Sequence, residues 1–74
     1  MSAITVIDSI WFTEMGGSRP IGIVLINNGY EEKAYIGTGE GINQKDDEEM
    51  VAARGAHFPV ELAKAILRNP CQDY

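Results

Sequence analysis

Apolar and polar positions alternate with the period of a β-strand near the start of the chain. In residues 3–14 (AITVIDSIWFTE), four apolar side chains share one parity, and Asp8 alone interrupts it: Ile4, Val6, Ile10 and Phe12. Alternation in a segment rich in β-branched and aromatic residues predicts a strand. The interruption predicts a bulge or bend near Asp8 and Ser9. Residues 15–20 (MGGSRP), with two glycines and a proline, predict the turn that follows.

Two more strand-like runs flank Asn28-Gly29, the preferred sequence for a two-residue type I′ hairpin loop. Such a loop would place Asn27 opposite Tyr30 and Gly22 opposite Tyr35. One face of the hairpin would then be apolar: Ile21, Ile23, Leu25, Ala34 and Ile36. The other face would be half apolar: Val24, Ile26 and Tyr35, beside Glu31 and Lys33.

The second half of the chain predicts two short helices. Asn43 is a suitable N-cap, and residues 46–49 place carboxylates in the first turns, where they favour the helix dipole. Gly55 suits a left-handed position after the first helix. Pro59 is suited to open a second helix over residues 60–68, where apolar residues recur at helical spacing.

The order β-β-β-α-α predicts one α+β domain over residues 1–74, with a three-stranded antiparallel meander followed by two short helices. We expect so few helices to cover only one face of the sheet. Trp11 and Tyr35 would then lie on the bare face, where aromatic residues often form binding hot spots. The alternative is that the bulge returns Trp11 to the core.

The composition limits which classes of protein this chain can belong to. The 74 residues are 45% hydrophobic, and the single cysteine, Cys71, excludes an internal disulfide, which favours a reducing compartment such as the cytoplasm. The longest apolar run, residues 21–26, is too short to cross a bilayer. A chain of this size without disulfides or an evident metal site often gains stability by forming homo-oligomers, which we expect here.

Negative charge is concentrated in one segment. Of the net charge of −5, residues 40–49 carry −4, from one lysine and five acids: Glu40, Asp46, Asp47, Glu48 and Glu49. An acidic chain is unsuited to direct binding of nucleic acid. The same acids, with Trp11 and Tyr35, would suit a protein partner with a basic surface.

The glycine-rich stretch GTGEG leaves two interpretations. Glycines between a strand and a helix can cradle a phosphate, and Arg19 and Tyr35 could assist four residues there: Gly37, Thr38, Gly39 and Gly41. However, Ile42 occupies the place of a fingerprint glycine, and acids crowd the loop, so a structural corner is favoured. The spacing of His57, Cys71 and the acids matches no metal or catalytic motif, so we expect no metal, no cofactor and no enzyme activity.

The runs IGIVL, KAYIGTGEG and GAHFPVELAKAIL resemble small uncharacterised proteins of bacteriophages and mobile elements, over residues 10–67. Acidic proteins of that origin are often counter-defence inhibitors of host machinery, including anti-CRISPR proteins. The resemblance therefore implies a non-enzymatic inhibitor that binds a protein in the host cytoplasm. The alternative is an oligomeric sponge that sequesters a small nucleotide-like anion.

Overall fold

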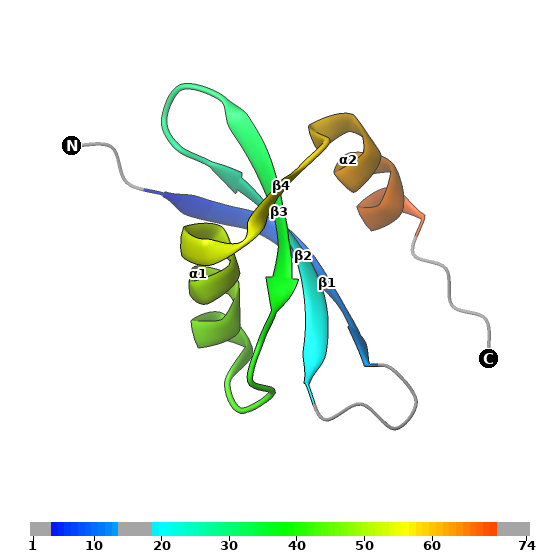
Figure 1. The fold of residues 1–74 in the computed structure, drawn as a ribbon. Helices are drawn as coiled ribbons and strands as arrows, with labels where there is room; N and C mark the ends of the chain where they lie inside the picture. The colour runs from blue at the N-terminus through cyan, green and yellow to red at the C-terminus, as the bar shows by residue number, and fades with distance from the viewer. Residues whose placement is uncertain (1–3, 14–18, 70–74) are drawn as a thin grey trace.

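The computed structural model describes residues 4–13 and 19–69 and shows an antiparallel sheet between two helices (Figure 1). The elements in chain order are β1 (Thr5–Thr13), β2 (Pro20–Asn27), β3 (Glu32–Thr38), α1 (Gln44–Arg54), β4 (Ala56–Phe58) and α2 (Val60–Arg68). The sheet order is β1-β2-β3-β4. The α+β class is confirmed. The expected turn at 15–20 lies mostly outside the described residues.

A short fourth strand corrects the predicted order. β4 pairs with β3 and sets His57 opposite Tyr35, with the two ring centroids 5.1 Å apart. Three residues followed by a proline are too few to show an alternating pattern, so the sequence did not reveal this strand. β4 lies at the edge of the sheet and joins the two helices (Figure 1).

Both faces of the sheet carry a helix, so the expectation of a bare face is wrong. α2 covers one buried cluster: Ile23, Leu25, Ala34 and Ala63. α1 covers the other: Val24, Ile26 and Val51. β2 is therefore buried on both sides, because β4 carries the chain from the α1 face to the α2 face.

The predicted bulge in β1 is confirmed and has a larger effect than expected. The register shifts between Val6 and Asp8. Val6 consequently pairs with Ile26 on the α1 face, whereas Ile10 pairs with Ile23 on the α2 face. Residues of one parity thus reach opposite faces, because each bulge inserts one extra residue into the alternation.

The hairpin lies where it was predicted, but its register differs by two residues. Val24 pairs with Tyr35 and Gly22 with Gly37, which leaves a four-residue loop over 28–31. Within the described residues, only glycines have positive φ, so Asn28 does not adopt the type I′ conformation. Its side chain instead accepts hydrogen bonds from the N–H groups of Tyr30 and Glu31. A shift of two preserves each residue's face.

Helix ends follow the sequence signals in part. The Asn43 side chain caps α1 by accepting from the N–H of Lys45 at 2.9 Å, as predicted, and Pro59 is the N-cap residue of α2. Gly55 is not left-handed, since its φ is −69°.

On the surface of α2, Lys64 forms an ion pair with Glu32. The hydrogen bond and the negative charge of Glu32 raise the pKa of Lys64 above its usual 10.5.

Candidate functional site

The corner between β3 and α1 contains a group of backbone donors that is already occupied. The Asp47 carboxylate accepts from the N–H of Glu40 at 2.9 Å and from the N–H of Gly41 at 3.0 Å. Asp47 is only 4% exposed. Successive N–H groups in a turn form an anion-binding concavity, and here the chain's own carboxylate fills it.

Glycine is required at position 39 because of this carboxylate. A Cβ atom on Gly39 would lie 2.6 Å from Cγ of Asp47, closer than side chains pack. The N–H of Gly39 donates to the carbonyl of Pro20 at 2.8 Å and so holds the corner against β2. The glycines of GTGEG thus serve a structural corner. A phosphate would have to displace Asp47 to reach the same N–H groups.

A second acid, Glu48, joins α1 to β1. Its carboxylate accepts from the Ser9 hydroxyl at 2.5 Å, and the Ser9 oxygen accepts from the indole N–H of Trp11 at 3.1 Å. The bulge makes this contact possible, because it turns Ser9 and Trp11 toward α1. Glu48 is half-buried and contributes to packing as well as to charge.

The other three acids of the segment are exposed: Glu40, Asp46 and Glu49. Ile42 lies among them in the chain and is 86% exposed. Ile42 therefore adds exposed apolar surface to the same stretch of chain as these carboxylates. We call these four residues the acidic corner. The sequence indicated its acids, but it did not predict the exposure of Ile42, whose apolar character favoured burial.

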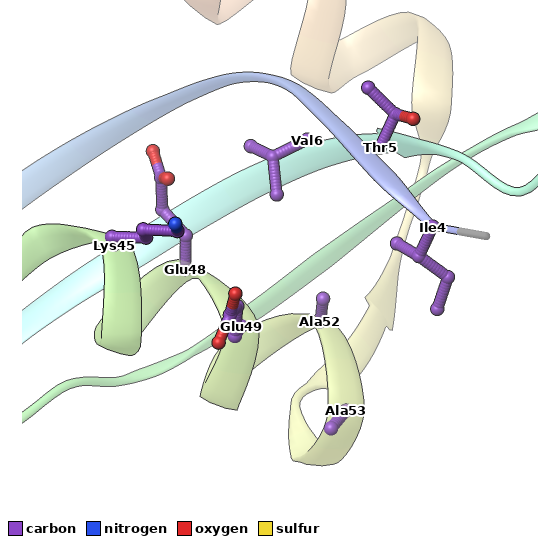
Figure 2. Close-up of a pocket in the computed structure, with 8 residues that line it drawn as sticks. All are labelled: Ile4, Thr5, Val6, Lys45, Glu48, Glu49, Ala52 and Ala53. Atoms are coloured by element: carbon purple, nitrogen blue, oxygen red, sulfur yellow. The ribbon is translucent and has the colours of Figure 1, made fainter.

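An open groove of about 510 Å³ runs between α1 and the start of β1 (Figure 2). Residues on one side of α1 form one wall: Lys45, Glu48, Glu49, Ala52 and Ala53. The opposite wall consists of Ile4, Thr5 and Val6. Glu49 therefore belongs to both the acidic corner and the groove. The groove was not predicted, because it depends on how α1 packs beside β1.

The predicted aromatic pair lies on the α1 face and is partly covered. Trp11 and Tyr35 are half-buried and pack against the cluster of Val24, Ile26 and Val51. The Trp11 ring lies over Gly22, where a Cβ would be 2.3 Å from the indole. The sequence had predicted that Tyr35, and not Trp11, would lie opposite this glycine. Only the exposed parts of the two rings are available to a partner.

The residues expected to hold an anionic ligand are only partly brought together. Arg19 is exposed and precedes Pro20, whose ring lies 3.4 Å from the position that a Cβ on Gly41 would occupy. Gly37 packs against Val51 beneath α1, and Thr38 is exposed at the end of β3. Arg19 is therefore next to the corner, but the N–H groups there already bind Asp47.

Comparisons with protein-family models, curated proteins and solved structures find no match to this chain. In the part of the chain that the structure describes, no group of three or more His, Cys, Asp or Glu residues is placed to hold a metal ion. None of the described helices has the length and apolar character needed to cross a membrane.

Proposed function

We propose that this chain is a non-enzymatic protein that binds a partner protein through its acidic corner. The observation that carries the proposal is that one short stretch, residues 40–49, combines the nearly fully exposed Ile42 with the exposed carboxylates of Glu40, Asp46 and Glu49. The carboxylates would steer a basic surface toward the chain, and Ile42 would supply apolar contact. Trp11 and Tyr35 would contribute through their exposed edges only.

The five acids differ in whether they make contacts within the fold, and this difference supports the proposal. Asp47 and Glu48 are engaged in contacts that hold α1 to the corner and to β1. Glu40, Asp46 and Glu49 are exposed, so a partner could contact them without disturbing the fold. The binding charge is therefore carried by three acids, whereas the sequence pattern suggested five.

The resemblance to counter-defence proteins indicates what kind of partner the acidic corner would bind. A basic partner surface of this kind is typical of proteins that bind nucleic acid. By covering such a surface with carboxylates, the chain would act as an inhibitor in the cytoplasm of the host. The sponge for a nucleotide-like anion is less favoured, because Asp47 already occupies the N–H groups it would use.

The test is a charge reversal at two exposed acids, Glu40→Lys with Glu49→Lys. The matched control is Glu31→Lys with Glu61→Lys, which changes the net charge equally at exposed sites on the β2–β3 loop and α2. Capture of the partner, quantified at low and high salt, should weaken about tenfold or more for the first pair only. Equal effects of both pairs would show that only overall charge matters and would overturn the proposal.

The apolar part of the corner has its own test. Ile42→Ser removes the exposed side chain and leaves every carboxylate in place, so it should weaken capture without changing its salt dependence. Tyr30→Ser is the control, because Tyr30 is equally exposed in a different loop. Unchanged capture by Ile42→Ser would remove Ile42 from the binding surface.

A further inference from the structure

We propose that two copies of this chain join through β1, pairing antiparallel edge to edge to form one continuous eight-stranded sheet. Within the described residues, β1 pairs only with β2, and no strand covers its outer edge. The strand has nine residues and is about 30 Å long, and the N–H of Ser9 on it donates to the Asp8 side chain at 2.8 Å. The opposite edge, β4, has three residues and is followed directly by Pro59.

Apolar exposure is concentrated on this strand. Six large hydrophobic residues are exposed among the described residues, and three of them lie in β1 or directly before it: Ile4, Ile7 and Phe12. The others lie on separate elements: Tyr30, Ile42 and Leu62. An exposed edge with large apolar side chains is the kind of strand that pairs with another chain.

The charges favour a second copy as the occupant over the basic partner proposed above. Of the eleven acids of the chain, Asp8 alone lies in β1, which contains no base. A strand from a basic partner would find little complementary charge there. Two copies of β1 avoid repulsion in every antiparallel register except one centred on residue 8, because only that register sets the two Asp8 carboxylates opposite each other.

The symmetry of the pairing places matching surfaces of the two copies side by side. Antiparallel pairing of identical edges places a two-fold axis perpendicular to the sheet, so α1 of both copies lies on one face and α2 on the other. Beyond the bulge, residues 8, 10 and 12 face the α2 side in register with Leu25, Ile23 and Ile21. Phe12 of each copy would therefore extend the apolar surface formed around Ile10. The bulge limits the regular ladder to residues 8–13.

The small core gives an energetic reason for the pairing. Among the described residues, seven hydrophobic side chains are buried, and the sheet divides them into two clusters. A domain of this size gains stability when further apolar surface is covered by association. This inference concerns a different surface from the acidic corner, so either can fail without the other.

The first test measures molar mass by light scattering and sedimentation. We expect the chain to have twice its mass of 8.1 kDa and Phe12→Lys to dissociate it to the single mass, raising the dissociation constant about a hundredfold because the change occurs twice per dimer. Leu62→Lys is the matched control, because Leu62 is 49% exposed on α2 and Phe12 is 41% exposed on β1. A monomeric parent chain, or dissociation by Leu62→Lys instead, would overturn the proposal.

A second measurement locates the contact without a substitution. Amide hydrogen exchange should slow in residues 8–13 as the concentration of the chain rises, while exchange in β4 stays unchanged. Ile7→Lys, at the exposed bulge next to this ladder, should weaken that concentration dependence even if Phe12→Lys fails to fold. Concentration-dependent protection in α1 or α2 without protection in β1 would show that association uses another surface. The Glu40→Lys, Glu49→Lys variant should remain dimeric.

Discussion

At the scale of single residues, the position of a charge decides what it does. Asp46 and Asp47 are neighbours of the same type, yet Asp46 is exposed and Asp47 is buried with two hydrogen bonds from the corner. Buried carboxylates that accept from backbone N–H groups stabilise a fold, whereas exposed ones mainly affect association. A count of acids in the sequence cannot make this distinction.

We predict that Asp47→Asn lowers the free energy of unfolding by about 2 kcal/mol. The two carboxylate oxygens each accept from one N–H group, whereas the amide of asparagine has one acceptor oxygen and no charge. Asp46→Asn should change it by no more than about 0.5 kcal/mol. Urea unfolding followed by fluorescence checks both, since Trp11 is the only tryptophan and packs beside α1. Equal losses for the two variants would show that the Asp47 contacts contribute no special stability.

At the scale of elements, the junctions between helices and strands determine the architecture. β4 follows α1 after a single residue, Gly55, and the chain then passes to the opposite face for α2. A Cβ at Gly55 would lie 2.6 Å from the carbonyl oxygen of Val51 and 2.8 Å from that of Ile36. Glycine is needed there for space between α1 and β3, and not for a left-handed backbone.

We therefore expect Gly55→Ala and Gly55→Asn to be similarly destabilising, each by about 2 kcal/mol or more, because both add a Cβ against backbone oxygens that cannot move easily. A left-handed position would instead tolerate asparagine better than alanine. Thermal unfolding of the two variants distinguishes these causes. Near-normal stability of Gly55→Asn would contradict the steric explanation.

At the scale of the whole molecule, the two helices cover both faces of the sheet, and the long edge strand β1 has no partner strand on its outer side among the described residues. The two surfaces proposed for association, the acidic corner and β1, lie on different elements. Association through an edge leaves both faces intact, so a dimer would present two acidic corners. A partner with repeated basic sites would bind such a dimer more tightly than a monomer.

The filled corner also predicts the response to small anions. Inorganic phosphate and adenine nucleotides should leave the melting temperature of the chain unchanged, because Asp47 already binds the N–H groups of Glu40 and Gly41. Asp47→Ala empties this position, and phosphate should then raise the melting temperature. Stabilisation of the unsubstituted chain, by about 2.7 kcal/mol at a hundred times the dissociation constant, would favour the nucleotide sponge instead.

The local features of the fold follow from the sequence because their causes are local. The bulge near Asp8, the Asn43 cap and the hairpin around Asn28-Gly29 depend on side chains within a few residues of each other. The alternation in β2 and β3 likewise assigned each residue to the correct face. A two-residue error in register left those faces unchanged, since side chains alternate with period two.

Only the tertiary structure decided which helix covers which face and what each acid contacts. β4 is too short to be recognised locally, because it exists through pairing with β3. Without it, both helices would appear to cover one face, and Trp11 would appear bare. The Asp47 and Glu48 contacts span segments that the fold brings together, from the corner loop and from β1. Sequence determined where the charge is concentrated, and packing determined which carboxylates remain exposed, since burial depends on neighbours distant in the chain.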